Sequence, residues 1–328
     1  MNTSLSYWAR LIMLQDSKNI IAERNFFTIF AKITLIVPLL KSAAKIFLIF
    51  LFMAVPLSAY SESLRESLRG DVTFLADSLV KGREFGTKGN LDAAFHINKS
   101  FRDAGLWARF QLYRSDGRTG RNVIGITPGF YDSYIVIGAH FDGLGFHGGR
   151  HYPGADSNAS GVAALLAIAR EIVHLRSHTG VIFVAFDGYN DSMSGSSAFL
   201  EEAFKSYKID LMVNLDILGA TSSPIREGQP AYLIALGAAA YSWQLNSIGR
   251  EAGLDLAFDY YGSSRFTDLF YKEISDQKWF LQKNIASIMF TSGITEHTNK
   301  ASDTPDKLDY PLLAGRTQLI SGWIGTLI

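Results

Sequence analysis

The sequence has no cysteine among its 328 residues. This absence excludes disulfides, thiolate metal sites and a lipidated N-terminal cysteine. The chain also lacks an excess of either charge, since Lys plus Arg and Asp plus Glu each total 31. A balanced charge gives no basic or acidic field that would attract nucleic acid or an acidic substrate. We therefore expect no nucleic-acid partner.

A long uninterrupted apolar run is missing as well. Residues 26–40 are apolar, but Lys32 and Pro38 interrupt them, so they are too short for a membrane span. Residues 41–61 instead combine two lysines, a short apolar stretch and small residues, which is the pattern of a secretory signal peptide. We predict export to the periplasm or beyond, with an uncleaved membrane anchor as the alternative. Any membrane contact is expected only through this N-terminal segment.

The leader, residues 1–40, precedes what looks like a complete signal, which leaves its place in the mature protein open. After Glu62 there is no internal repeat, low-complexity linker or composition break. We therefore expect residues 62–328 to form one domain.

Helical and strand patterns alternate along that domain. This alternation predicts an α/β fold with a mostly parallel central sheet and helices on both faces. Helices are expected at 64–78, 90–104, 158–175, 194–204, 239–252 and 311–327, and strands at 107–113, 122–127, 134–139, 181–186, 209–216, 232–236 and 285–290.

Chemistry-bearing residues follow several of these strands. His140 and Asp142 come directly after the strand 134–139, Asp216 closes the strand 209–216, and Asp156 lies in a Gly-Ala-Asp turn. Open α/β sheets bind ligands at the carboxyl ends of their strands. Imidazole and carboxylate groups converging from separate loops are ligands for a divalent metal.

Five motifs together resemble a known family. They read G-A-H-F-D, P-G-A-D-S-N-A-S-G, V-A-F-D-G, N-L-D-I-L-G and S-D-T-P-D-K-L-D. In this order they resemble the two-zinc exopeptidases typified by bacterial leucyl aminopeptidase and aminopeptidase S, whose fold glutaminyl cyclases share. The resemblance runs from about Leu64 to the C-terminus.

The resemblance implies a zinc site and hydrolysis of peptide or protein N-termini. His140, Asp156 and Asp216 match three metal ligands of the family, and Asp156 matches the carboxylate that bridges two zincs. Asp142 matches the residue that orients the imidazole from behind.

The other half of the family's site is missing. Tyr189 stands where the resemblance places the general-base Glu, and Asn190 stands where it places a ligand of the second zinc. Asn299 stands at the position of the late ligand His. A neutral phenol does not replace a carboxylate base at pH 7. An amide is also a poor zinc ligand.

Two readings follow. In the first, the chain is a catalytically impaired or inactive member that retains one zinc or none, as in the related ectodomains of transferrin receptor and nicastrin, where the fold serves binding. In the second, Asp191 and His297 have taken over as shifted ligands, two zincs bind, and Asp187 or Asp191 is the base. A single-metal transferase or lyase is a third possibility.

Further side chains have both a functional and a structural interpretation. His147 and His151 are either extra ligands or solvated loop histidines. The pairs Tyr260–Tyr261 and Trp279–Phe280 either line a specificity pocket or fill the core. The sequence leaves the oligomeric state open.

Overall fold

The computed structural model describes residues 61–221 and 225–328. The leader and all but the last residue of the predicted signal peptide lie outside the described residues. Residues 61–328 form one compact unit. Across the described ranges, no helix combines the length and apolar character needed to cross a membrane.

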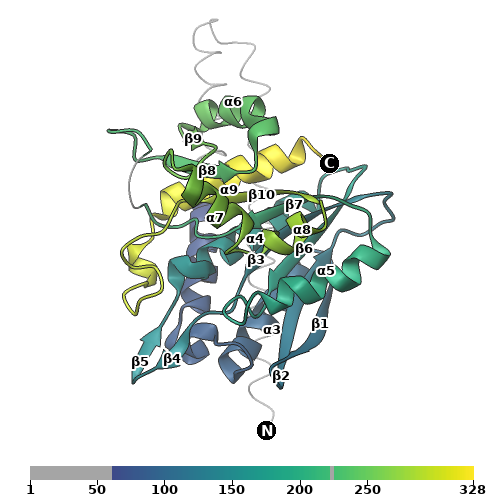
Figure 1. Cartoon of the computed structure of the whole chain (residues 1–328), viewed down its shortest axis with the longest axis vertical. Helices are drawn as coiled ribbons and strands as arrows, with labels where there is room; N and C mark the ends of the chain where they lie inside the picture. The colour runs from purple at the N-terminus through teal and green to yellow at the C-terminus, as the bar shows by residue number, and fades with distance from the viewer. Residues whose placement is uncertain (1–60, 222–224) are drawn as a thin grey trace, which may run out of the picture. The chain divides into compact units, whose positions relative to one another are not determined.

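An eight-stranded sheet forms the centre of this unit (Figure 1). Its strand order is β1-β2-β6-β3-β7-β10-β8-β9. The strands are β1 (Trp107–Ser115), β2 (Arg118–Ile126), β3 (Tyr134–His140), β6 (Gly180–Phe186), β7 (Ile209–Leu215), β8 (Tyr232–Leu236), β9 (Asp255–Ala257) and β10 (Ala286–Thr291).

The four central strands are mutually parallel. β3 pairs with β6 and β7, and β7 pairs with β10, all in parallel. β1 and β2 form an antiparallel hairpin on one side, and β8 runs antiparallel to β10 on the other. Every residue of β3 and β6 is buried, as expected for strands covered on both faces. The predicted fold class is confirmed.

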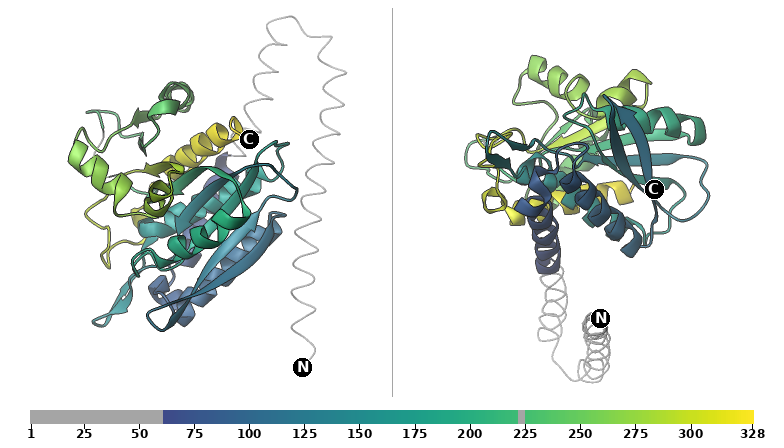
Figure 2. Two further views of the ribbon diagram at one scale, coloured as in Figure 1. Left: turned by 45° about the vertical axis from the view of Figure 1, so that its right-hand side comes forward. Right: turned by 90° about the horizontal axis from the view of Figure 1, so that it is seen from below.

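Helices cover both faces of the sheet (Figure 1, Figure 2). One face packs against α3 (Lys88–Asp103), α4 (Ser160–Ile172), α9 (Tyr310–Gly325) and the helical residues 61–75. The other face packs against α5 (Ser194–Ser206) and α8 (Gln277–Gln282). The helices α6 (Ser242–Ala252) and α7 (Ser264–Lys272) complete the unit.

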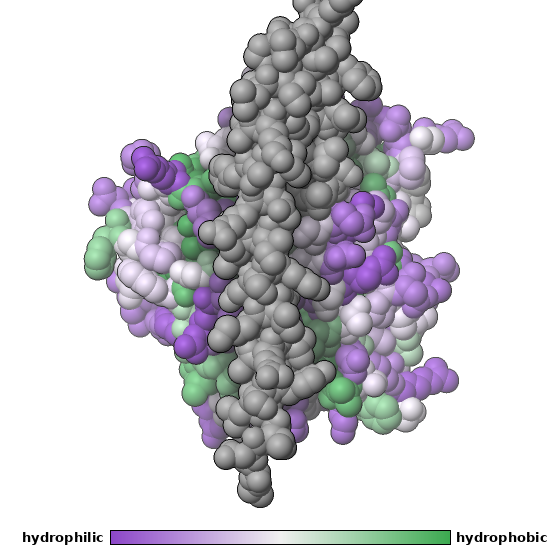
Figure 3. Space-filling view, turned by 180° about the vertical axis from the view of Figure 1, so that it is seen from behind, coloured by the Kyte–Doolittle hydropathy of each residue, from purple (hydrophilic) through white to green (hydrophobic). Residues whose placement is uncertain are grey.

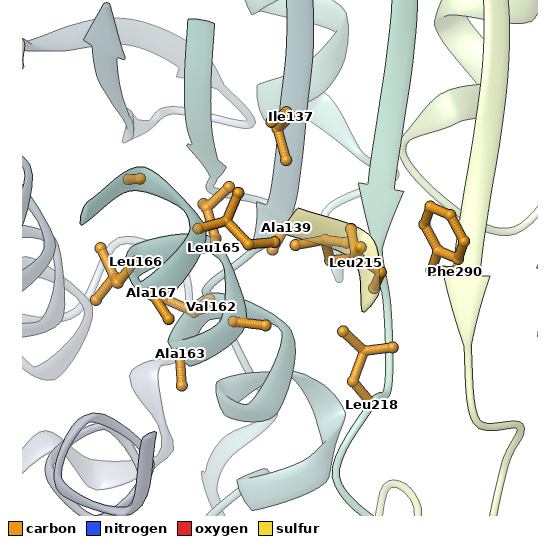
Figure 4. Close-up of a cluster of buried hydrophobic side chains, with 14 of the residues drawn as sticks. Ile137, Ala139, Val162, Ala163, Leu165, Leu166, Ala167, Leu215, Leu218 and Phe290 are labelled. Carbon is orange, nitrogen blue, oxygen red and sulfur yellow. The ribbon is translucent and has the colours of Figure 1, made fainter. Parts of the chain in front are cut away.

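The helix α4 is central because it is apolar on nearly all sides. Most of its residues are buried, as expected for a helix enclosed between a sheet and other helices. Figure 4 shows Val162 and Leu165 of α4 near Ala139 at the end of β3, with Leu215 of β7 alongside. Two residues before α4 begins, Asn158 Oδ1 accepts the N–H of Gly161, which satisfies a free donor of the first turn.

The short elements were not predicted from the sequence. They are the hairpin β4 (Gly145–His147) and β5 (Arg150–Tyr152), the strand β9, the helices α7 and α8, and the short turn Ser78–Arg83. The short turns Ala155–Ala159, Ala239–Tyr241 and Pro305–Lys307 lie where the sequence predicts a turn or the start of a helix. Elements this short contain too few residues to show a clear hydrophobic periodicity in the sequence.

Figure 3 shows polar and apolar residues interspersed over the visible part of the rear face.

Candidate metal centre

The sheet brings His140 and Asp216 together. Parallel pairing places Gly138 opposite Asn214, so the residues two positions later leave the sheet at the same edge. His140 Nε2 lies 3.5 Å from Asp216 Oδ1, and both side chains are buried. Burial alone would lower the pKa of His140, but the approach of Asp216 and the charge of Asp142 raise it.

The backbone carbonyl of Asp142 fixes the state of the imidazole. His140 Nδ1 lies 3.2 Å from this oxygen, which only accepts hydrogen bonds. In the neutral ring Nδ1 therefore carries the proton and Nε2 keeps its lone pair. The lone pair faces Asp216, which is the orientation a metal ligand needs.

The carboxylate of Asp142 holds the turn that follows β6. Its Oδ1 accepts the N–H of Tyr189 at 2.8 Å, and its Oδ2 accepts the N–H of Asn190 at 3.1 Å. Asn190 Nδ2 also donates to Asp142 Oδ2, at 3.2 Å. The Asn190 amide is thus turned toward Asp142. The carboxylate stands 4.0 Å from His140 Nδ1, so it lies behind the imidazole as the family resemblance implies.

Tyr189 covers one face of the imidazole. Its ring stacks on that of His140 with centroids 3.9 Å apart and planes 11° apart. Its hydroxyl donates to the backbone oxygen of Ile274 at 2.8 Å. Burial, followed by the charge of Asp216, raises the pKa of Tyr189 above its usual range. The phenol is therefore neutral at pH 7.

Asp156 is held from two sides. Its Oδ1 accepts the N–H groups of Gly219 and Ala220 at 2.7 and 3.2 Å and the hydroxyl of Ser160 at 3.0 Å. Its backbone N–H donates to Asp303 Oδ1 at 2.8 Å. Burial, and then the charge of Asp303, raise the pKa of Asp156 to about 6.

Two buried side chains offer unpaired donor atoms near the end of β3 and before α4. Among the described residues, no three His, Asp or Glu side chains are grouped so that they could hold a metal ion. However, His140 Nε2 and Asp156 Oδ2 are both buried and lack a hydrogen-bond partner. Two ligands bound tetrahedrally to zinc at roughly 2.0–2.1 Å lie about 3.4 Å apart. The His140–Asp216 separation is close to that distance, so this pair fits a zinc ion.

The side chains considered as shifted ligands have other partners. Asp191 Oδ1 accepts from Arg118 at 2.8 Å, and Asp191 Oδ2 accepts from Ser194 Oγ at 3.0 Å. His297 Nδ1 lies 3.1 Å from Ser302 Oγ, and its Nε2 lies 3.8 Å from Glu296.

Two further positions are also engaged away from the imidazole. Asn299 Oδ1 accepts from Ser157 Oγ at 3.4 Å. Asp187 accepts three N–H groups, from Asn90, Arg121 and its neighbour Gly188. Both carboxylate oxygens of Asp187 are therefore engaged in holding this turn.

The remaining candidates have structural surroundings. His147 is exposed on the hairpin β4–β5, with Nε2 3.7 Å from Glu84. His151 lies on the same hairpin, and burial lowers its pKa. The pair Trp279–Phe280 packs into the core on the α5 side. Tyr260 stacks on Phe270 in a separate cluster with Tyr232, so Tyr260 fills the core. Tyr261 is 39% exposed, and its hydroxyl lies 3.0 Å from that of Tyr232.

Sequence reasoning missed several residues that build the centre. Asp303 accepts the backbone N–H groups of Asp156 and Ser157 through its two carboxylate oxygens. Ser275 donates to Asp216 Oδ2 at 2.6 Å. The guanidinium of Arg83 is fully buried and donates to four backbone carbonyls. A lone Arg or Ser in a loop carries no sequence signal for such contacts.

Comparison with known families agrees with this geometry. Residues 122–324 match peptidase family M28, which is more than half of the chain. The chain belongs to peptidase family M28. This is a family of metallopeptidases, and the match confirms the resemblance seen in the motifs.

Individual relatives extend the comparison. A probable zinc metalloprotease of Pyrenophora tritici-repentis is 33% identical over 95 residues, which is 27% of this chain and 21% of that protein. The chain thus spans about a fifth of that relative's length. The LapA aminopeptidase of Legionella pneumophila is similar in structure, with a TM-score of 0.66, 14% identity and coverage of 82% and 72% of the two chains.

A glutaminyl cyclase of Porphyromonas gingivalis is also similar, with a TM-score of 0.62 and 18% identity over 80% of this chain and 98% of that one. At these identities the solved structures establish the fold, which is that of the zinc exopeptidases and glutaminyl cyclases.

Proposed function

We propose that this chain is an exported M28 member in which peptide hydrolysis is impaired or lost. In this proposal it retains one zinc position, held by His140, Asp156 and Asp216. The proposal rests mainly on the environment of Tyr189, which stands at the position of the family's general base. Its ring is stacked on His140 and its hydroxyl is bound to a backbone oxygen.

A general base must accept a proton from water near the reacting carbonyl. Tyr189 is neutral, and its hydroxyl is already committed as a donor. Loss of a positioned base lowers a rate by roughly 10²–10⁴-fold. The Asn190 amide, which faces Asp142, contributes no charge toward a second cation. We therefore propose that the chain has no general base and binds no second zinc.

When bound, zinc supplies a Lewis acid that polarises oxygen ligands. The residues of this chain orient the imidazole, exclude water and hold carboxylates in place. An ion that binds only the folded state stabilises that state. In the proposal, zinc at the retained position therefore has a structural role.

The alternative, an active aminopeptidase with shifted ligands, requires Asp191 and His297 to move to the centre. Each would first have to leave its present partners, Arg118 and Ser302. Substrates would then be peptide N-termini, as in the family.

Back-mutation tests the proposal. Tyr189→Glu, Asn190→Glu and Asn299→His are combined in one chain, and zinc is counted by elemental analysis. We expect about one zinc per wild-type chain, about two in the triple variant, and peptidase activity only in the variant. Two zincs in the wild type would favour shifted ligands instead.

The export part of the proposal rests on residues 41–61. Cell fractionation with N-terminal sequencing of the mature protein tests it. A cytoplasmic protein that keeps these residues would contradict export.

A further inference from the structure

The strand β1 leaves one edge of the central sheet open. It is the last strand at its end of the sheet (Figure 1), and in the parts of the chain that the structure describes no strand pairs with its outer side. Its pairing with β2 runs without a shift from Trp107 to Ser115. The strand also contains no proline, a residue that protects many natural sheet edges. A long and regular edge of this kind presents free backbone groups to another strand.

The hairpin turn shows which backbone groups face this edge. β1 and β2 are joined by Asp116 and Gly117, whose φ angles of 45° and 74° are those of a two-residue type I′ turn. The pair that closes such a turn, Ser115 and Arg118, is hydrogen-bonded, and hydrogen-bonded pairs alternate along an antiparallel ladder. The N–H and C=O groups that point to the open edge therefore belong to the even-numbered residues, Ala108, Phe110, Leu112 and Arg114.

Apolar side chains accompany these free backbone groups. Phe110 and Leu112 lie on the same face of the strand, and Leu112 is 63% exposed. On α3, Phe95 is 55% exposed, although its ring meets that of Phe110 edge-on with centroids 5.4 Å apart. Covering these side chains would remove apolar surface from water, which favours association.

The sequence of β1 is complementary to a second copy of itself. When two β1 strands pair antiparallel about a two-fold axis at Gln111, Phe110 of each copy lies opposite Leu112 of the other. This is a pair whose free backbone groups can exchange hydrogen bonds. A shift of the axis to Leu112 would instead set Phe110 opposite Arg114, so the apolar match selects one register.

The two arginines of β1 do not oppose this pairing. About an axis at Gln111, Arg109 faces Tyr113 of the other copy and Arg114 faces Ala108, so no two like charges meet. Each guanidinium also has a partner within its own chain. Arg109 donates to Glu202 at 2.7 Å, and Arg114 donates to Thr119 Oγ1 at 2.6 Å.

We propose that the open edge of β1 binds a second copy of this chain and joins the two sheets into one. An extended peptide of another protein would also satisfy the free backbone groups. Such a peptide would not require, however, that Phe110 match Leu112 and that the arginines avoid one another about a two-fold axis. This self-complementarity favours the second copy. The pairing does not depend on the metal centre, which lies at the carboxyl ends of β3 and β7.

Sedimentation equilibrium over a range of protein concentrations tests the interface. We expect the wild type to form dimers. Leu112→Lys sets a charge opposite Phe110 twice in each dimer, so it should raise the dissociation constant at least about a hundredfold. The matched control is Trp243→Lys, which should leave the dimer unchanged. Trp243 is also exposed, but it lies on α6, which packs against β9 at the other end of the sheet.

A single introduced thiol tests the register, because the chain has no cysteine. Gln111→Cys places one thiol of each copy at the axis. Facing Cα atoms of a non-hydrogen-bonded pair are about 4.5 Å apart, which a disulfide can bridge. Arg109→Cys lies on the same face but opposite Tyr113 of the other copy. Under mild oxidation we expect a disulfide-linked dimer from Gln111→Cys and not from Arg109→Cys.

Three outcomes would overturn this interface. The first is a wild type that stays monomeric at every concentration, which would leave a peptide of another protein as the occupant of the edge. The second is a dimer that Leu112→Lys leaves as tight as the wild type. The third is cross-linking that is no faster in Gln111→Cys than in Arg109→Cys. Because Leu112 is exposed, Leu112→Lys should keep the wild-type melting temperature of the monomer and remains informative if Gln111→Cys does not fold.

Discussion

The ring of Tyr189 lies face to face with the imidazole of His140, with centroids 3.9 Å apart. This contact joins the turn after β6 to the end of β3. Because the Tyr189 hydroxyl is also fixed to Ile274, one side chain connects three loops of the centre. In the proposed function, the residue at the position of the family's general base covers a proposed metal ligand.

This contact predicts different effects for two replacements of Tyr189. Tyr189→Phe keeps the stacked ring and loses one hydrogen bond, so unfolding free energy should fall by about 1 kcal/mol. Tyr189→Ala removes the ring and should cost about 3–5 kcal/mol. It should also speed zinc transfer to a chelator, whereas Tyr189→Phe should release zinc at the wild-type rate. Equal release rates for the two variants would contradict the covering role.

Replacing Arg83, which lies outside the metal centre, is predicted to lower the free energy of unfolding strongly. Its guanidinium is the donor for the carbonyls of Leu75, Phe141, Pro153 and Gly154. Arg83→Met leaves these buried acceptors without a donor and should lower the unfolding free energy by at least about 3 kcal/mol.

The matched control is Arg109→Met. Arg109 pairs with Glu202 in an exposed salt bridge, so its loss should cost under about 1 kcal/mol. Urea unfolding of both variants checks the contrast. Similar losses would show that the carbonyl contacts of Arg83 contribute little.

The buried acids predict how metal-free stability depends on pH. Burial raises the pKa of Asp156 to about 6 and that of Asp276 to about 7, above the value near 4 in the unfolded chain. Between these values the folded state binds more protons, so its stability falls as pH rises from about 4 to 7. The raised pKa of His140 acts in the same direction, because its contribution is lost as pH rises through the folded value.

Thermal melts at pH 5 and pH 8 measure this dependence. We expect the metal-free melting temperature to fall by more than about 4 °C, since 1 kcal/mol corresponds to roughly 2–4 °C in a domain of this size. Zinc should reduce the fall, because it favours the deprotonated ligands. A metal-free protein that is more stable at pH 8 would contradict the prediction.

The fold could be predicted from the sequence because its main elements are long and strongly patterned. The run Tyr134–Ala139 is continuously apolar and lies in the fully buried strand β3. Just before α4, the side chain of Asn158 accepts the N–H of Gly161. Parallel strands then require that His140 and Asp216 leave the sheet at one edge. Short elements such as β9 and α7 are too short to show a hydrophobic periodicity, so the sequence did not predict them.

The site could be predicted only in part. Motif position predicts a site at His140, Asp142, Asp156 and Asp216, and the structure brings His140 close to Asp142 and Asp216. The sequence could not show that Tyr189 stacks on His140, because that contact depends on how two loops meet. The burial of Asp276 is likewise a property of the folded chain.

The most direct test of the central claim is the aminopeptidase activity of the unmodified chain. Hydrolysis of aminoacyl-arylamides is measured with zinc in excess, beside His140→Ala, Asp191→Ala and His297→Ala. The account predicts a wild-type rate no higher than that of His140→Ala. Hydrolysis that is clearly faster in the wild type and is lost in Asp191→Ala or His297→Ala would contradict it, because the ligands would then have moved rather than been lost.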